Sequence, residues 1–196
     1  DAVRYLSNRS SGKMGYAIAK AAVHRGLAVS LVSGPTAISM PYGVDAHYVK
    51  TAHEMHSKVM EVATSHDIFV SVAAVSDFRF DDPADSKISS RKEVLDLRLV
   101  KNPDIAASVG HLKSKRPFCV AFTLQDMLDT NKAFVKLNEK KCDLIFLNTI
   151  GPDSGFEVDE NSLSYMSLDA RTPIDLGQGS KLSLAEKVMD VILNTH

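Results

Sequence analysis

The sequence predicts an α/β protein with a Rossmann-like, mostly parallel sheet, helices on both faces, and an antiparallel dimerisation arm. Apolar runs rich in Val and Ile alternate with segments of helical periodicity, which is typical of parallel strands joined by crossover helices. The 196 residues, of which 44% are hydrophobic, suffice for one domain with a substantial core. Residues 87–101 instead alternate apolar and polar side chains, as a half-exposed strand outside the main sheet does.

The elements follow from these patterns in chain order. Strands buried on both faces are expected at residues 28–34, 45–49, 67–75, 117–124 and 142–148. Helices are expected between them at residues 13–26, 52–66, 103–115 and 128–141. A hairpin of residues 161–168 and 171–177 should precede a last helix over residues 183–196. Because ligands of such sheets bind at the carboxyl ends of the strands, functional residues are expected just after each strand.

The expected arm has an apolar face formed by Leu95, Leu97 and Leu99, with polar side chains between them. An apolar row outside the core favours packing against another chain. We therefore expect these leucines to pack on a partner subunit.

Composition and charge exclude several classes of function. A net charge of −1 and a pI near 6.7 argue against nucleic-acid or anionic-membrane partners, which require a concentrated basic surface. No apolar run approaches the ~18 residues of a membrane-spanning helix, and no signal segment opens the chain, so a cytoplasmic protein is expected. Cys119 and Cys142 are interpreted as buried free thiols, and the scattered histidines predict no metal site.

The stretch SNRSSGKMGYAIAKAA, residues 7–22, predicts an anion site. Ser10, Ser11 and Gly12 stand where the N-cap and first turn of a helix belong, and the free N–H groups there attract anions. An ordinary capped helix would explain these residues alone. It would not explain the polar and cationic residues that surround the same turn, which are Arg4, Asn8, Arg9 and Lys13. The spacing matches neither a P-loop nor a GxGxxG fingerprint.

The stretch SVAAVSDFRF ends a predicted strand with two small residues and an acid. Ala73 and Ala74 would let a ligand approach the backbone closely. Asp77 could accept a hydrogen bond from a ligand or cap a turn, and both interpretations stay open. Lys87 follows an acidic loop, where most lysines are only solvated.

Two further stretches have both a structural and a functional interpretation. In VKNPDI, Asn102 as N-cap and Pro103 as first helical residue explain the pattern structurally, although a helix N-terminus there would also attract an anion or a base edge. Lys136 and Lys140 lie four residues apart on one helix face. That face is either simply solvated or a clamp for phosphates.

Taken together, DAVRYLSNRSSGKMG, AAVSDFR, KIS, LVKNPDI, CDLIFLNT and SGFEVDEN resemble, in that order, the phosphopantothenoylcysteine synthetase family of coenzyme A biosynthesis. The resemblance covers residues 1–196 as one phosphopantothenate–cysteine ligase domain. It implies that the carboxylate of 4′-phosphopantothenate attacks the α-phosphate of CTP and releases pyrophosphate. The amine of L-cysteine then displaces CMP from the acyl-cytidylate.

The resemblance also implies the cofactor and the partners. Mg²⁺ is expected to bind through the CTP phosphates, with no ligand from protein side chains. A homodimer is implied, and in the full-length protein a fusion to a flavin-dependent phosphopantothenoylcysteine decarboxylase domain. In the family a strand precedes the residues that match the start of this chain, so that first strand is expected to be missing before Asp1.

Roles of single residues come from the same resemblance. Asn8 is expected to hold the carboxylate and then the acyl-cytidylate, and Lys87 to offset charge that develops on the α-phosphate. The other substrate-binding residues are expected to be Arg4, Ser10, Gly12, Gly15, Ala73, Ala74 and Asp77, with Arg4 reaching the acyl group in the partner subunit. The nucleotide-binding residues are expected to be Ala73, Asp77, Lys87, Pro103, Asp104, Ile105, Ala106, Phe122, Lys136 and Lys140.

The chain departs from the family pattern at a few positions. Many bacterial members have lysines where this chain has Ser89 and Ser90, and a Glu where it has Gln125. The missing first strand and the serines at positions 89 and 90 favour a rival hypothesis, a non-catalytic nucleotide-binding or dimerisation module that retains the fold. Retention of both Asn8 and Lys87 favours the ligase. An NAD(P)-dependent oxidoreductase, which the fold rhythm alone would allow, lacks its GxGxxG fingerprint.

Overall fold

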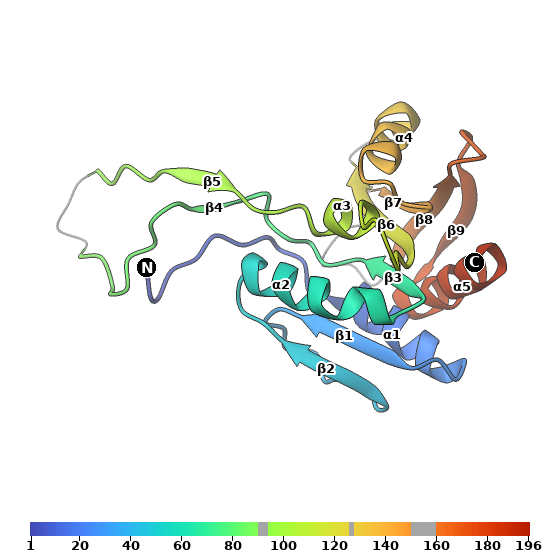
Figure 1. Cartoon of the computed structure of the whole chain (residues 1–196), viewed down its shortest axis with the longest axis horizontal. Coiled ribbons are helices and arrows are strands. Elements are labelled where there is room, and N and C mark those ends of the chain that lie inside the picture. Colours follow the sequence, from blue (N-terminus) through green and yellow to red (C-terminus); the bar gives the residue numbers. More distant parts are fainter. Residues whose placement is uncertain (90–93, 126–127, 150–159) are drawn as a thin grey trace.

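The order and direction of the strands confirm the predicted fold class. The computed structural model describes residues 1–89, 94–125, 128–149 and 160–196 (Figure 1). Ser90 and most of the SGFEVDEN stretch lie outside these ranges. Within them the main sheet has the order β3-β6-β7-β8-β9, in which the β3–β6 and β6–β7 pairs are parallel and the β7–β8 and β8–β9 pairs antiparallel. Its strands are β3 Ile68–Ser71, β6 Phe118–Gln125, β7 Leu144–Thr149, β8 Glu160–Ser167 and β9 Ile174–Ser180.

A second parallel pair lies beside this sheet. Strands β1, Val29–Ser33, and β2, Val44–Tyr48, pair with each other in parallel. The expectation of a further strand that precedes residue 1 stays a prediction. The helices are α1 Lys13–His24, α2 Ala52–Val62, α3 Ile105–Gly110, α4 Thr130–Glu139 and α5 Lys181–Thr195, and a short 3₁₀ turn, Ala63–Ser65, follows α2.

Helices cover both faces of the main sheet, as predicted. Alternate residues of β6 point to opposite faces, so Cys119 packs among α2, α3 and α4, whereas Val120 packs among α1 and α5. Both of these residues are fully buried. Continuous apolar runs form these strands because both faces of the sheet must be shielded from water.

The two cysteines confirm the prediction of buried free thiols. Burial raises the pKa of Cys119 to about 11 and that of Cys142 to about 12. Both thiols therefore stay protonated near neutral pH. No helix in the described ranges has the length and apolar character needed to cross a membrane.

An antiparallel arm projects from the body of the molecule (Figure 1). Its strands β4, Phe78–Phe80, and β5, Leu99–Lys101, pair antiparallel, so β5 covers only the end of the predicted strand 87–101. The N-terminal segment runs beside the arm, where the Asp1 carboxylate accepts a hydrogen bond from the Ile88 N–H at 3.0 Å. The antiparallel arm is confirmed, and its role in dimerisation stays a prediction.

Several element boundaries differ from those predicted, and α3, for example, ends at Gly110 rather than at residue 115. The strand predicted over residues 67–75 ends at Ser71, which leaves the residues after it outside the sheet. The second strand of the hairpin extends to Ser180 rather than to residue 177. Ser180 then caps α5 by accepting a hydrogen bond from the Ser183 N–H at 3.2 Å, so the helix begins at Lys181.

Close packing between the ends of α3 and α4 generates a prediction. A Cβ atom on Gly110 would lie 1.9 Å from the carbonyl oxygen of Lys140. We expect Gly110→Ala to lower the free energy of unfolding by about 3 kcal/mol or more, because backbone must move. Gly34→Ala is the matched control, since its Cβ would lie no closer than 3.9 Å to Met55. Urea unfolding of both variants measures the difference, and equal losses would contradict the packing described.

Candidate functional site

The first part of the site forms where the N-terminal segment meets the carboxyl end of β3. The Asn8 side chain joins them, because its amide N–H donates to the carbonyl of Ala74 and its oxygen accepts from the Ser10 N–H at 2.8 Å. Ala73 and Ala74 are exposed there, as expected of a strand end that a ligand approaches. Asn8, Ser10, Ala73 and Ala74 are therefore brought together, as predicted.

The start of α1 lies next to this junction, and we call its segment from Ser10 to Gly15 the cradle. Gly12 is the N-cap with φ +80°, a conformation that favours glycine, and no side chain in the described ranges caps the helix there. Gly15 lies over the end of β3, since a Cβ on it would be 3.9 Å from Val72. The first turn of α1 thus adjoins the end of β3, and its role as an anion site stays a prediction.

Thr36 also borders the cradle, next to Gly12, and is not among the site residues predicted from the sequence. The Thr36 hydroxyl donates to the carbonyl of Ser11 at 3.1 Å, and its oxygen accepts from the Ile38 N–H at 3.2 Å. Thr36 follows β1, so its position after a strand was the signal that could have identified it. Tyr16 and Ser33 support the same corner through a buried hydroxyl pair 3.0 Å apart.

The second part of the site is the start of α3. Asp104 is its N-cap and accepts from the Ala107 N–H at 3.0 Å, and its carboxylate pairs with the Lys140 ammonium. Burial alone would raise the pKa of Asp104, but the Ala107 N–H and Lys140 together lower it below its ordinary value. Lys140 therefore does not simply belong to a solvated face.

The interpretation of Asn102 as the N-cap of this helix is wrong. Asn102 instead follows β5 and joins the base of the arm to the residues that directly precede β4. Its N–H donates to the carbonyl of Asp77 at 2.8 Å, and its side-chain amide donates to that of Ser76 at 2.8 Å. Asp77 itself is exposed beside this connection. Asp and Asn are both good caps, so the local sequence could not decide between positions 102 and 104.

The remaining residues that were predicted to bind the nucleotide lie on two faces of the sheet. Lys136 donates to the Thr123 hydroxyl at 3.1 Å, on the α3 and α4 side. Pro103 is half-buried just before α3, whereas Ile105 and Ala106 bury their side chains in the core, so they can offer a ligand mainly backbone groups. Phe122 points to the α1 and α5 side, where it stacks on Phe146 at 5.0 Å between ring centroids.

Lys87 lies in the arm and Arg4 in the N-terminal segment beside it, so neither lies at the edge of the main sheet. Arg4 pairs with the Asp1 carboxylate and donates to the carbonyl of Ile88 at 3.0 Å, next to the exposed Lys87. Gln125, where the family pattern has a Glu, is buried and bonds the backbone of Asp129 through both ends of its amide. It therefore ties the end of β6 to Asp129, the N-cap of α4.

Metal ligands do not gather in the part of the chain that the structure describes. No three or more His, Cys, Asp or Glu side chains lie there in an arrangement that could hold a metal ion.

A family model for the C-terminal domain of DNA/pantothenate metabolism flavoproteins matches residues 1–195. The chain belongs to this family. The coenzyme A biosynthesis bifunctional protein CoaBC of Vibrio cholerae is 42% identical over 195 residues, which are 98% of this chain and 48% of that protein. CoaBC of Haemophilus influenzae is 38% identical over 196 residues, again with 48% of its length covered. The chain thus spans about half the length of the curated relatives that it matches.

Solved structures agree with this assignment. The C-terminal domain of a CoaBC protein superposes with a TM-score of 0.79 and 30% identity, covering 98% of this chain and 88% of that one. A Cab2 mutant in complex with phosphopantothenate-cysteine superposes with a TM-score of 0.74 over 98% of this chain and 80% of that one. At 15% identity, that likeness concerns the fold alone. The family expected from the sequence motifs is confirmed.

The charge of Asp104 generates a prediction. Asp104→Asn keeps a capping oxygen and removes the charge. The pKa of the folded carboxyl lies below its ordinary 3.8, so the charge stabilises the fold above that pH and ceases to do so as pH falls through the folded pKa. We expect a loss of less than about 1 kcal/mol near pH 7, because the side chain is half exposed, and a smaller loss near pH 2. Urea unfolding at both pH values measures this, and an equal loss at both would contradict it.

Proposed function

We propose that the chain is a phosphopantothenate–cysteine ligase domain of coenzyme A biosynthesis. It activates the carboxylate of 4′-phosphopantothenate with CTP, releases pyrophosphate, and joins the resulting acyl-cytidylate to L-cysteine with release of CMP. The observation that carries this proposal is the Asn8 amide, which links the α1 cradle to the exposed end of β3. Membership of a family whose curated relatives are CoaBC proteins supports it.

The Asn8 amide suits a role toward a carboxylate. One of its N–H groups donates to Ala74, which leaves a second donor on the same nitrogen for a substrate oxygen. An amide adds no charge, so it can hold first the carboxylate and then the acyl-cytidylate. The cradle of Ser10, Gly12 and Gly15 would bind the phosphate at the other end of the substrate.

The nucleotide would bind on the α3 and α4 side. Lys136 and Lys140 lie one turn apart on α4 and supply positive charge for the triphosphate. Lys140 is already paired with Asp104, so Mg²⁺ carried by the phosphates would supply part of the neutralising charge. The exposed Asp77 and the backbone at Pro103 would contact the ribose and base.

The cellular setting completes the proposal. The domain acts in the cytoplasm as a homodimer, in which Arg4 reaches the partner's acyl group. In the full-length protein it is fused to a flavin-dependent phosphopantothenoylcysteine decarboxylase domain. The name "bifunctional protein" of relatives about twice as long as this chain supports the fusion.

Two variants separate the half-reactions. Lys87→Gln removes the charge that stabilises phosphoryl transfer, so acyl-cytidylate formation should fall about 100-fold or more while CTP binding weakens only modestly. Asn8→Asp should still form the intermediate slowly but misplace it for attack by cysteine. Radiolabelled acyl-cytidylate should therefore accumulate in Asn8→Asp and be missing in Lys87→Gln. If both variants lose activity only in proportion to CTP affinity, the two residues serve binding alone, as in a non-catalytic module.

The dimer has its own test. Leu95, Leu97 and Leu99 are 44%, 54% and 45% exposed on the arm, a row that a partner subunit would cover. We expect Leu97→Asp to convert a dimer into monomers at micromolar concentration in sedimentation. Leu168→Asp is the matched control, because Leu168 is 46% exposed and lies outside the arm. A wild-type monomer at this concentration, or equal dissociation of both variants, would overturn the assignment.

A further inference from the structure

A carboxylate without an assigned role lies where the N-terminal segment meets the arm. The side chain of Asp1 is only 1% exposed. Its Oδ1 accepts hydrogen bonds from the backbone N–H groups of Val3 at 3.0 Å and of Arg4 at 2.9 Å. Its Oδ2 accepts from Arg4 Nε at 2.9 Å and from the Ile88 N–H at 3.0 Å, and it pairs with Arg4 Nη2 as well. Such a set of donors is what a buried carboxylate requires.

These contacts hold the backbone of Ile88 on both sides. Its N–H donates to Asp1, and its carbonyl accepts from Arg4 Nη2 at 3.0 Å. The Ile88 N–H lies in the same rigid peptide plane as the Cα of Lys87. Lys87 itself is exposed, whereas Ile88 is half-buried. Asp1 therefore fixes the backbone from which the Lys87 side chain extends.

The paired strands of the arm do not explain this arrangement. β4 and β5 pair over residues 78–80 and 99–101, and the chain between them extends the arm farther from the body (Figure 1). Residues 82–89 form neither helix nor strand, and most of them are exposed. A segment of this kind opens easily unless side chains anchor it. The Asp1 carboxylate supplies such an anchor next to Lys87.

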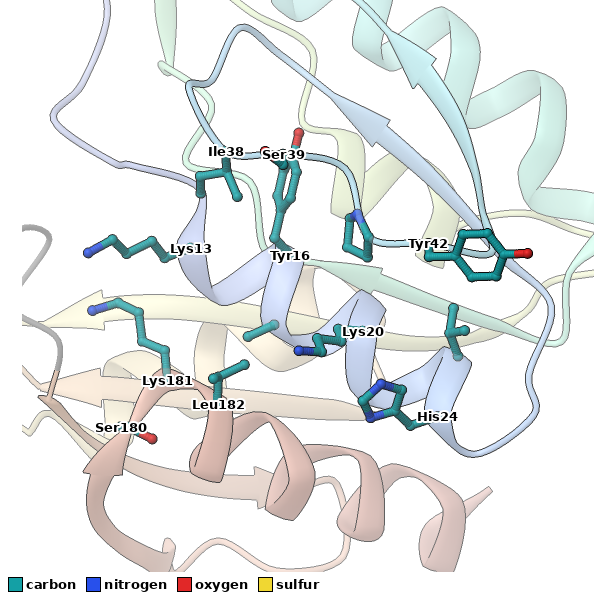
Figure 2. A pocket seen from close by; sticks show the side chains of 13 residues that line it. Lys13, Tyr16, Lys20, His24, Ile38, Ser39, Tyr42, Ser180, Lys181 and Leu182 are labelled. Carbon is teal, nitrogen blue, oxygen red and sulfur yellow. The ribbon is translucent and has the colours of Figure 1, made fainter.

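The same N-terminal segment also carries Asn8. It continues from Asp1 through Asn8 and enters α1 next to Lys13, where Figure 2 shows the last part of its course. Asn8 is bonded to the carbonyl of Ala74, so the segment is joined to the chain after β3 near its end and to the arm at its start. The two residues expected to act in catalysis are thus connected through one short segment.

We propose that Asp1 is a positioning residue for the first half-reaction, which holds Lys87 in the place where its ammonium offsets charge on the α-phosphate. This inference rests on the proposed function and adds to it a buried residue that acts through Lys87 rather than on the substrates. Charge stabilisation of phosphoryl transfer depends on distance, so a catalytic ammonium has to be in place before the reaction begins. The hydrogen bond from Ile88 to Asp1 is the contact that holds it there.

Asp1→Asn tests this role, because an amide cannot accept all the hydrogen bonds of the carboxylate. The rate of pyrophosphate release from CTP and 4′-phosphopantothenate should fall about tenfold or more, since small displacements of a catalytic group have effects of this size. The Kd for CTP should change less than about threefold. Asp85→Asn is the matched control, because it removes the same charge from an exposed carboxylate near Lys87, with an expected change of less than about twofold. Equal losses of rate in both variants would overturn the inference.

A double-mutant cycle shows whether Asp1 acts through Lys87. In the Lys87→Gln background, Asp1→Asn should lower the rate of pyrophosphate release less than about twofold further, because the ammonium that it positions is already missing. A full additional loss would mean that Asp1 acts through another group, such as Arg4, and the inference would then be wrong.

Cleavage by trypsin after Lys87 reports the position of this segment without any turnover. The hydrogen bonds of Ile88 should protect the Lys87–Ile88 peptide bond in the wild type, and Asp1→Asn should raise its rate of cleavage about tenfold, as followed by mass spectrometry. Cleavage after the exposed Lys50 is the internal reference for overall unfolding. An unchanged rate after Lys87, or an equal rise at both sites, would speak against an anchor at Asp1 and overturn the inference.

The two kinds of measurement separate this inference from the proposed function. A wild type that releases no pyrophosphate from CTP and 4′-phosphopantothenate would refute the proposed function, and the cleavage assay would still decide whether Asp1 holds Lys87. Normal pyrophosphate release by Asp1→Asn would refute this inference alone.

Discussion

The close packing of α1 against the sheet and against its neighbour α5 is the constraint on which the rest of the site depends. Ala17, Ala21 and Ala22 of α1 are buried in the apolar cluster that also contains α5. Short side chains let the helix axis approach the sheet, so the first turn, at Gly15, comes to lie over Val72 at the end of β3. A bulkier residue at Ala21, which is 1% exposed, would displace the helix. The cradle would move with it, and the hydrogen bond between Asn8 and the Ser10 N–H would be disturbed.

The sheet divides the predicted binding groups between its faces. The cradle lies on the α1 and α5 side, whereas Asp104, Lys136 and Lys140 lie on the side of α3 and α4. The exposed segment after β3 touches both, because Asn8 ties it to the cradle and Asn102 ties it to the chain that leads into α3. On the proposed function, the carboxylate and the α-phosphate would therefore meet over this segment. The far ends of 4′-phosphopantothenate and CTP would be held on opposite faces of the sheet.

Repeating local patterns made much of the fold predictable. Continuous apolar runs between segments of helical periodicity located the buried strands within a few residues. The alternation of Leu95, Leu97 and Leu99 with polar residues identified the arm. The grouping of Asn8 with Ala74 was predictable only through family motifs, because the contact joins residues 66 positions apart. Contacts that depend on tertiary packing leave no signal in the local sequence. The pairing of Lys140 with Asp104 and the face to which Phe122 points are of this kind.

The partners of Lys136 and Lys140 indicate how the α3 and α4 side of the sheet would treat negative charge. Lys140 is paired with the Asp104 carboxylate, so this pair contributes little net charge. Lys136 donates to the Thr123 hydroxyl, a neutral partner that leaves its charge unchanged. On the proposed function, the triphosphate would therefore depend on Lys136 and on a cation that it carries itself.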